Sequence, residues 1–577
     1  MNSASALKGR HTDLSRMNPM SDSVLVSGSQ LFCREPMLQR LEHETFDVLI
    51  IGGGITGAGV ALDAATRGLS TALIERDDFA SGTSSKSSKL VHGGLRYLQQ
   101  GEINLVYQAL HERRRLRRNA PHLVKVLPFM IPILTKNGVV SRKIARAMGS
   151  AMWMYDITGG WRIGKVHKRL RKDAAFVHLP TMPKERLASA YLYYDAAADD
   201  ARLVLNVLRT AAANGAVVTN GCSLVELQKD AHGAITGAVV EADGRRFTVS
   251  AKVVVNAAGV WADDVRALAE DHHPDSIRPA KGVHITVPWE KVRNDIAVVI
   301  PVPKDRRSLF VVPWDELPDG TFRHCYIGTT DTDYQGTLLD PPCTKDDIDY
   351  VLAALNATVN TNVTADDITG VWAGVRPLVK AASSGRTADL SRHHKVDHHG
   401  NGVITITGGK LTTYREMAED TVDAVLQRLD RKVRCRTRNL PLLGAVGFRE
   451  PKPGAPDTHL ANRFGTLANE VRSLIAADPS LGEPLVPGLP YLRAEAVYAV
   501  RNEMALSLDD VLTRRTRARI FDRGATLRAA PAVAALLAAE LGWDAAETAE
   551  QLASFTAQCE AEEHAAVTAE QHEPKPV

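Results

Sequence analysis

The chain has 577 residues, of which 44% are hydrophobic and 24% are charged, a balance typical of a globular protein with several domains. The 70 Lys and Arg residues exceed the 67 Asp and Glu residues by only +3, which does not indicate a nucleic-acid-binding protein. Aromatic residues make up 5% of the chain, so base-stacking surfaces are not expected either. A collagen, a wholly disordered chain and a polytopic membrane protein are excluded.

Six cysteines lie far apart and form no C-x-x-C pair, which argues against a zinc site and a disulfide scaffold and fits a reducing cytosol. No clustered His, Asp and Glu pattern indicates a metal, so none is expected. No run of about 18 apolar residues is present, so we expect no helix that spans a bilayer. Residues 1–43 contain no secretory h-region and are expected to be a flexible extension.

Residues 47–51 form a short apolar run that predicts a buried parallel strand. Glycines follow it, an Ala-rich helix is expected at 58–67, and residues 71–75 read as a second strand. Together these segments predict one βαβ unit.

The glycines of this unit are spaced as Gly52-x-Gly54-x-x-Gly57. Gly52 would make the tight turn, Gly54 would let the backbone approach a pyrophosphate, and Gly57 would let helix and strand pack closely. The helix N-terminus would face the anion. Glu75, at the end of the second strand, is placed to accept hydrogen bonds from a ribose. The unit predicts a dinucleotide site, and the motif alone leaves FAD and NAD open.

The rest of the chain divides into recognisable stretches. A Ser/Gly/Lys-rich loop is expected at 81–89, and residues 277–375 carry many strand runs punctuated by proline, as in an antiparallel sheet. Residues 457–565 are rich in Ala, Leu, Arg and Glu and are expected to be helical. Other predicted elements are a helix at 102–118 and strands at 216–219, 237–240, 252–255, 283–288, 309–313, 326–330 and 403–407.

Five stretches resemble the FAD-dependent, quinone-linked glycerol-3-phosphate dehydrogenases. The likeness runs from about residue 40 to 555. It implies a discontinuous Rossmann-type α/β FAD-binding domain, a β-rich substrate domain like that of the D-amino-acid and glycine oxidases, and a C-terminal helical cap. The stretches are 51–68, 87–98, 373–378, 408–418 and 498–512.

This resemblance places the domain boundaries. The FAD-binding domain is expected to comprise residues 44–110, 196–265 and 368–435. The substrate domain, with a membrane-contact region, takes 111–195 and 266–367. The helical cap covers 436–565, and 566–577 form a tail.

The resemblance also implies which residues bind the cofactor and the substrate. It places a cationic pocket around the phosphate of sn-glycerol 3-phosphate, and arginine forks suit that dianion. The expected substrate contacts are Arg96, Tyr97, Arg376, Arg392 and Lys410. The expected FAD contacts are Gly52, Gly54, Ile55, Thr56, Gly57, Glu75, Arg76, Ser84, Ser85, Ser88, Lys89, His92, Gly93, Gly94, Ala258, Gly259, Gly409, Lys410, Leu411 and Thr412.

Catalysis requires that the C2 hydroxyl of this substrate lose its proton while hydride leaves C2, so a general base is needed. By family likeness His284 is the candidate base, and its ordinary pKa near 6.5 suits that task. A histidine that merely packs on a strand is the alternative. Lys410 and Arg376 complete the expected catalytic set, and Lys410 could stabilise the developing alkoxide or the reduced flavin.

The family passes electrons to a membrane quinone, so we expect a peripheral protein on the cytoplasmic face of the cell membrane. A helix at 142–157 would carry an apolar face and could contact anionic lipid, aided by basic residues after it. The chain could also form a homodimer. The predicted face contains Ile144, Ala147, Met148, Ala151, Met152, Met154 and Tyr155, with Trp153 off it; the basic residues are Lys165, Lys168, Arg169, Arg171 and Lys172.

Three alternatives stay open at the level of sequence. Oxygen could replace the quinone, which would make the chain a glycerol-3-phosphate oxidase. An amine or amino-acid flavin oxidase would need a carboxylate clamp in place of the phosphate clamp. A flavoprotein without enzymatic activity is the third.

Overall fold

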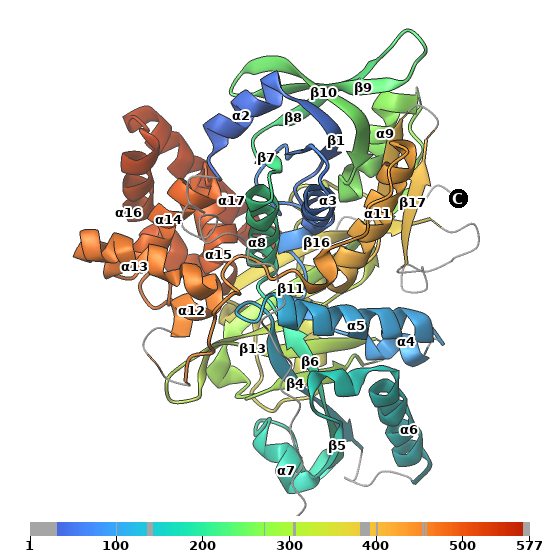
Figure 1. Cartoon of the computed structure of the whole chain (residues 1–577). Coiled ribbons are helices and arrows are strands. Elements are labelled where there is room, and N and C mark those ends of the chain that lie inside the picture. The colour runs from blue at the N-terminus through green and yellow to red at the C-terminus, as the bar shows by residue number, and fades with distance from the viewer. Residues whose placement is uncertain are drawn as a thin grey trace, which may run out of the picture.

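The computed structural model describes residues 32–99, 101–135, 142–270, 272–303, 307–380, 393–399, 402–452, 455 and 458–568, apart from the side chains of residues 96, 99 and 142–148. Two large sheets lie one above the other in Figure 1, and the C-terminal helices, coloured orange to red, run along one side of them. The expected α/β architecture with a helical C-terminal domain is confirmed.

The first sheet joins segments that are far apart in the chain. Its order is β17-β18-β10-β1-β2-β7, with β8 and β9 as an antiparallel extension of β10. The β18, β10, β1, β2 and β7 neighbours pair in parallel, and β17 is antiparallel to β18. The strands are β1 (Thr45–Ile51), β2 (Thr71–Ile74), β7 (Val217–Thr219), β8 (Ser223–Lys229), β9 (Ile235–Ala242), β10 (Arg245–Asn256), β17 (His394–His398) and β18 (Val403–Gly408).

Helices cover the first sheet, as the runs of buried apolar residues in β1 and β2 require. They are α3 (Ile55–Thr66), α8 (Asp200–Ala213) and α11 (Tyr414–Arg428). The predicted βαβ unit is therefore confirmed.

The second sheet is mostly antiparallel, with order β15-β11-β14-β13-β12-β4-β6-β3, and with β16 paired to β11 and β5 to β6. It confirms the prediction of strands within 277–375. The strands are β3 (Leu90–Val91), β4 (Lys125–Leu134), β5 (Lys168–Arg171), β6 (Leu187–Ala197), β11 (Ile277–Pro288), β12 (Ala297–Pro301), β13 (Ser308–Glu316), β14 (Phe322–Gly328), β15 (Thr332–Asp333) and β16 (Gly370–Val379).

Two strands correct the predicted domain boundaries. Residues 44–110 and 368–435 were assigned to the FAD-binding domain, yet β3 and β16 lie in these segments and belong to the second sheet. The reason is pairing: β16 lies antiparallel to β11 over ten residue pairs, from Ile277 with Val379 to Thr286 with Gly370. The chain thus passes into the second sheet at β16 and is back in the first sheet at β17.

Further helices pack around the second sheet and form the C-terminal domain, where the helical prediction is confirmed. Around the sheet lie α4 (Leu95–Gln99), α5 (Ile103–Asn119), α6 (Arg142–Thr158), α7 (Lys172–Val177) and α10 (Lys345–Asn356), whereas α9 (Ala262–Glu270) lies against β8, β10 and β18 of the first sheet. The C-terminal domain contains α12 (Thr458–Phe464), α13 (Ala468–Ala477), α14 (Arg493–Glu503), α15 (Ala518–Phe521), α16 (Arg523–Leu541) and α17 (Ala545–Val567).

Among the described helices, α16 alone is long and apolar enough to cross a membrane by length and composition. Its buried face includes Val533, Ala534 and Leu537, which lie in the core cluster that the C-terminal domain forms. One face of α16 therefore packs within the C-terminal domain.

The amino end corrects another expectation. Residues 1–43 were expected to be flexible, but α2 (Arg34–His43) is an ordered helix whose Met37, Leu38 and Leu41 are buried. Phe32 lies before it, with its ring centroid 5.9 Å from that of Phe79. These apolar side chains anchor the segment to the first sheet's core. Residues 1–31 lie outside the described part of the chain.

Candidate active site

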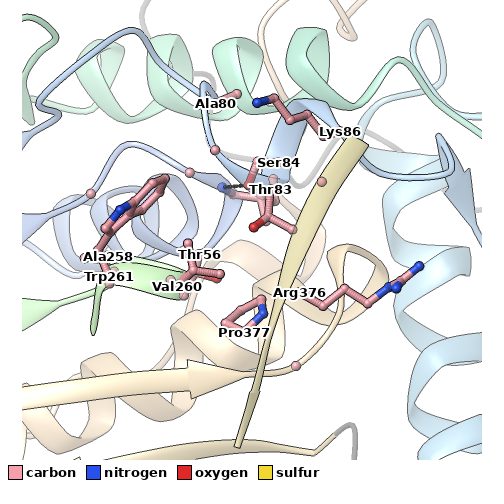
Figure 2. Close-up of a pocket in the computed structure, with 18 of the residues that line it drawn as sticks. Thr56, Ala80, Thr83, Ser84, Lys86, Ala258, Val260, Trp261, Arg376 and Pro377 are labelled. Atoms are coloured by element: carbon pink, nitrogen blue, oxygen red, sulfur yellow. Dashed lines mark hydrogen bonds between the residues drawn. The ribbon is translucent and has the colours of Figure 1, made fainter. Parts of the chain in front are cut away.

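A cavity of about 580 Å³ extends between the two sheets, and both sheets contribute to its walls. This volume is in the range of small-molecule and cofactor sites. Figure 2 shows part of the wall: Ala80 to Lys86 come from the loop after β2, Ala258 to Trp261 from the turn after β10, and Arg376 and Pro377 from β16. Two loops of the first sheet and a strand of the second therefore meet at one cavity.

One end of the cavity is built by the glycine turn after β1. Gly52 has φ +111°, and a Cβ on it would lie 2.7 Å from the carbonyl oxygen of Ala257. A Cβ on Gly57 would lie 1.9 Å from the carbonyl oxygen of Gly52. Only glycine fits both positions. The first turn of α3 opens here, and the Ile55 N–H donates to Ser84 Oγ at 2.9 Å. This end offers backbone donors and a positive helix end to an anion.

Glu75 stands beside this turn, where β2 ends. Its carboxylate accepts hydrogen bonds from the Gly53 N–H at 2.7 Å and from the Asp77 N–H at 3.0 Å. Burial is the largest influence on this group and raises its pKa to about 7, although the two N–H groups oppose the rise. A ligand hydroxyl that donates to Glu75 would stabilise the charged carboxylate.

The other end of the cavity is cationic. Lys410 and Arg376 both line it, and Lys410 Nζ lies 3.7 Å from the ring centroid of Tyr97. The Arg376 guanidinium donates from Nη2 to Thr329 Oγ1 at 2.9 Å and pairs with Asp331 at 3.4 Å. These contacts hold its planar fork in place, so this end is suited to a phosphate or carboxylate.

His284 lies in the wall of this cationic end and is 2% exposed. Its Nε2 is hydrogen-bonded to Ser88 Oγ at 2.9 Å, and its ring stacks on Trp372 with centroids 4.7 Å apart and planes 8° apart. Burial, followed by the positive charges of Lys89 and Arg376, lowers the pKa of His284 well below its ordinary value. The ring is therefore neutral at neutral pH and can accept a proton.

His92 also lines the cavity, and burial lowers its pKa to about 4. It is neutral as well, so the charge at this end comes from Lys410 and Arg376.

Comparisons with known proteins agree with this geometry. Residues 47–415 match the family of FAD-dependent oxidoreductases, and residues 435–548 match the C-terminal domain of α-glycerophosphate oxidase. Glycerol-3-phosphate dehydrogenase 2 of Mycobacterium tuberculosis is 41% identical over 91% of this chain and 90% of its own length. The chain belongs to the FAD-dependent glycerol-3-phosphate dehydrogenase family.

Other members of this family show the same likeness. A mitochondrial glycerol-3-phosphate dehydrogenase of Arabidopsis thaliana is 37% identical over 88% of this chain and 85% of its own. The X-ray structure of the Bacillus halodurans enzyme complexed with FAD has a TM-score of 0.74 and 30% identity, covering 93% of this chain and 99% of that one. L-α-glycerophosphate oxidase from Mycoplasma pneumoniae shares the fold, with a TM-score of 0.51 and 18% identity over 68% of this chain and 97% of that one.

FAD is therefore the cofactor, and the cavity fits it. The glycine turn leaves room that a Cβ would fill, the α3 N-terminus faces that room, and Glu75 offers a carboxylate where β2 ends. The turn, the helix end and the acid are the features that bind a pyrophosphate and a ribose.

Most residues that the family likeness singled out meet in this cavity. They come from segments that lie far apart in the chain, so the fold brings them together. Those in the wall are Gly52, Gly54, Ile55, Thr56, Glu75, Arg76, Ser84, Ser88, His92, Tyr97, Ala258, Gly259, His284, Arg376, Gly409, Lys410, Leu411 and Thr412.

Five predicted FAD contacts are not among the residues that line the cavity, and their contact with the cofactor stays a prediction. The Lys89 side chain is fully buried and reaches Asp200 Oδ1 and the Ser85 carbonyl, each at 3.3 Å. Its neighbours are protein groups because an ammonium in the interior needs a counter-charge. The other four are Gly57, Ser85, Gly93 and Gly94, which pack against neighbouring protein atoms.

Two predicted substrate residues cannot be placed. Arg392 lies outside the described residues, and the side chain of Arg96 is not described, although its backbone belongs to α4.

Other wall residues were not predicted from the sequence. Trp261 lies in the wall with Arg76 stacked on its ring at 5.1 Å, and Lys86 extends from the loop to the Leu339 carbonyl at 2.7 Å. Trp372, which supports His284, was also missed. It is opposite His284 in the β11–β16 pairing, and no local sequence signal reports such a register.

Proposed function

We propose that this protein oxidises sn-glycerol 3-phosphate to dihydroxyacetone phosphate. The observation that carries this proposal is that Arg376, Lys410, Tyr97 and His284 line the same cavity as the dinucleotide turn. Relatives that cover most of the chain are named glycerol-3-phosphate dehydrogenases, which supports the same substrate.

The cationic end would bind the substrate phosphate. Arg376 is held by Thr329 and Asp331, so its fork is pre-organised to donate paired hydrogen bonds to phosphate oxygens. Lys410 adds a second positive charge next to Tyr97. By resemblance, Arg96 and Arg392 would complete the phosphate contacts.

Proton removal falls to His284 in this proposal. Its neutral imidazole would accept the C2 hydroxyl proton, and the hydrogen bond between its Nε2 and Ser88 Oγ and the stacked Trp372 orient the ring. Lys410 would stabilise negative charge that develops on the substrate oxygen. When bound, FAD supplies the hydride acceptor, and the protein supplies position and electrostatic field.

The test is the visible spectrum of the purified protein under anaerobic conditions. The expected result is loss of the oxidised flavin band on adding glycerol 3-phosphate, with one dihydroxyacetone phosphate formed for each flavin reduced. If an amine or amino acid reduces the flavin and glycerol 3-phosphate does not, the proposed substrate is wrong and the protein is an amine or amino-acid oxidase instead.

We propose further that electrons leave to a membrane quinone and that the protein binds the inner face of the cell membrane. An exposed apolar patch, which we call the α6 patch, supports this. Arg162 stacks on Tyr107 and Trp161 within it at 5.7 and 4.9 Å. The patch comprises Ile103, Tyr107, Trp153, Met154, Ile157, Trp161 and Val166. Aromatic rings and exposed cations together suit a lipid headgroup interface.

The α6 patch differs from the face that the sequence predicted. Met152 and Tyr155 are buried, whereas Trp153 and Met154 are exposed. The buried Tyr155 hydroxyl donates to Asp195 at 2.8 Å. The helix periodicity grouped Met152 and Tyr155 correctly on one face and left Trp153 off it, but these two side chains pack into the interior, and Met154, which was predicted on the same face, is exposed. The side chains of 142–148, which the prediction included, lie outside the described residues. Lys165, Lys168, Arg169 and Arg171 next to the patch are exposed.

Flotation with vesicles tests the membrane proposal. Wild-type protein should float with vesicles that contain anionic lipid, and Ile157→Glu with Trp161→Glu should not, at unchanged turnover with a soluble dye acceptor. Equal flotation of both proteins would remove the α6 patch from membrane binding. Measuring quinone reduction against peroxide under air then distinguishes the dehydrogenase from the oxygen-using alternative.

A further inference from the structure

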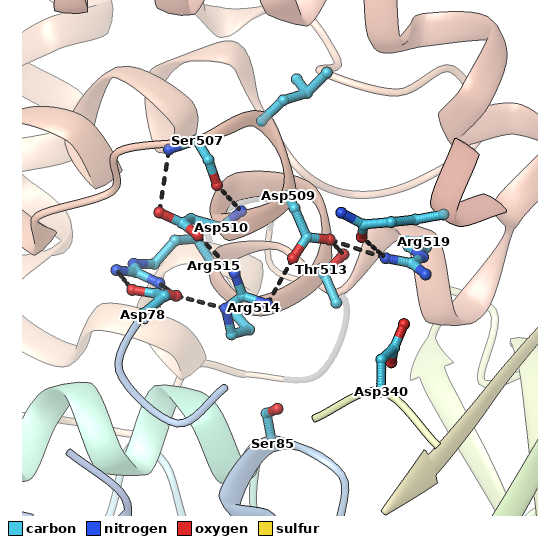
Figure 3. A network of polar contacts seen from close by, with 12 residues as sticks. Asp78, Ser85, Asp340, Ser507, Asp509, Asp510, Thr513, Arg514, Arg515 and Arg519 are labelled. Carbon is cyan, nitrogen blue, oxygen red and sulfur yellow. Dashed lines mark hydrogen bonds and ion pairs between the residues drawn. The ribbon is translucent and has the colours of Figure 1, made fainter. Parts of the chain in front are cut away.

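Two arginines of the C-terminal domain reach the loop behind the FAD-binding turn. Residues Asp510–Arg515 form a π-helical turn, a rare form that is frequent at functional sites. Arg514 Nε donates to Asp78 Oδ2 at 2.5 Å, and Arg515 donates to both Asp78 oxygens at 2.6 and 2.8 Å, as Figure 3 shows. Asp78 lies three residues after Glu75, at the start of the loop.

A third arginine reaches the same loop further along. Arg517 has φ +68° and is 1% exposed, so the backbone adopts a left-handed conformation at a position where a glycine is not used. Its guanidinium donates to Asp199 Oδ1 at 3.0 Å, to Asp200, and to the Ser85 carbonyl at 3.3 Å. This one side chain thus joins the C-terminal domain to α8 and to the loop.

Asp200, which accepts from Arg517, also binds the end of the loop. Its Oδ2 accepts from the Ser87 N–H at 3.0 Å and from the Ser87 hydroxyl at 2.7 Å, and its Oδ1 accepts from Lys89 Nζ at 3.3 Å. The segment Asp78–Lys89, which we call the cofactor loop, is therefore held by the C-terminal domain at its start and middle, and at its end by Asp200 of α8, which itself pairs with Arg517. Within it, regular structure is limited to the three-residue turn Thr83–Ser85.

The opposite side of the cofactor loop forms the wall of the FAD cavity. Ser84 Oγ accepts from the first N–H of α3, and the Ala80 N–H donates to the Gly53 carbonyl at 3.1 Å. The loop residues in the wall are Ala80, Ser81, Gly82, Thr83, Ser84, Lys86, Ser87 and Ser88. The loop thus contacts the pyrophosphate turn on one side and buried arginines on the other.

We propose that Arg514, Arg515 and Arg517 are positioning residues for FAD: the C-terminal domain holds the cofactor loop in the conformation that binds the cofactor. A buried ion pair contributes little net stability but costs much when one partner is removed. Loss of one arginine would leave Asp78, or Asp200 and the Ser85 carbonyl, with fewer donors in the interior, and the loop would move to hydrate them. This inference rests on FAD as the cofactor and not on the identity of the substrate.

The test compares Arg517→Met with a matched control in the full-length chain. Arg519 is the control because it is equally buried, at 4% exposed, and pairs with Asp509 and Glu562 of its own domain. Both substitutions remove a buried guanidinium from the same domain. Bound FAD is removed, and FAD is titrated back while flavin fluorescence and thermal stability are recorded.

We expect Arg517→Met to raise the Kd for FAD by about tenfold or more, the effect of one lost hydrogen bond to a charged group. Arg519→Met should lose comparable thermal stability, but its Kd for FAD should stay within about twofold of the wild-type Kd, a smaller change than the loss of one such hydrogen bond produces. Saturating FAD should restore turnover of the Arg517 variant. An unchanged Kd in a folded Arg517→Met protein, or the same rise in both variants, would overturn the proposal.

A milder change keeps the test decisive if Arg517→Met does not fold. Arg517→Lys keeps the charge but loses the fork that reaches Ser85 and Asp199 together. FAD should dissociate faster from this holoenzyme than from wild type, and an equal dissociation rate would refute the positioning role. A wild-type protein that binds no FAD would instead refute the cofactor assignment, which separates the two failures.

Discussion

Arg376 offers a direct test of the phosphate site, through the length-matched, uncharged substitution Arg376→Met. The Arg376 side chain is 26% exposed and is held by Thr329 and Asp331, so it lies partly out of water. One hydrogen bond from a guanidinium to a phosphate oxygen contributes about 1.5 to 3 kcal/mol in such a setting. This range corresponds to roughly a 10- to 150-fold loss of affinity.

The phosphate does not react, so its binding energy is realised equally in the bound substrate and in the transition state. We therefore expect the KM for glycerol 3-phosphate to rise by roughly 10- to 150-fold, while kcat changes by less than about threefold. Steady-state kinetics with a dye acceptor measure both constants. The flavin spectrum of the purified variant checks that FAD stays bound.

Arg278 provides the matched control for this experiment. It lies on β11, pairs with Asp333 at 2.6 Å and does not line the cavity. Arg278→Met should leave both kinetic constants unchanged. A wild-type KM in Arg376→Met, or an equal rise in the two variants, would refute the placement of the phosphate at Arg376.

Three further outcomes follow from the buried groups of the site. Since burial holds the pKa of His284 well below its ordinary value, kcat should stay level as the pH falls through 6.5, and an acidic limb centred there would contradict the neutral base. His284→Asn should lower kcat by about 10²- to 10⁴-fold with FAD retained, and near-normal turnover would leave His284 a packing residue. In the folded protein the pKa of Glu75 is about 7, above its unfolded value of 4.5. Between pH 4.5 and 7 the folded FAD-free protein therefore binds more protons than the unfolded chain, so its free energy of unfolding, measured in urea, should fall as the pH rises through this range. Glu75→Gln should remove this slope, and an unchanged slope would assign it to other groups.

The FAD-binding turn is the part of the molecule that the sequence predicted best. The strands at 47–51 and 71–75, the glycines between them and Glu75 are neighbours in the chain, and β1, α3 and β2 form there. A tight turn, a close helix–strand contact and a helix N-terminus are local requirements, so a few residues specify them. The residues of the stretch 408–418 likewise reach the cavity, where Lys410 meets Tyr97.

Long-range pairing, by contrast, was decided only in the tertiary structure. Trp372 supports His284 because β16 pairs with β11 in one particular register, and a shift of one residue would place another side chain there. The face of α6 that is buried depends on Asp195, which β6 brings to Tyr155. An apolar periodicity reports that a helix has a buried face but does not identify its partner.

The C-terminal domain shows the same division. Its helical character was evident from composition, since Ala, Leu, Arg and Glu favour helices. Its contacts with the cofactor loop were not evident, because Arg517 and Ser85 are 432 residues apart in the chain and meet only in the tertiary structure. Local backbone preferences and glycine geometry are encoded within short segments, whereas the partners of buried charges are set by how distant segments pack.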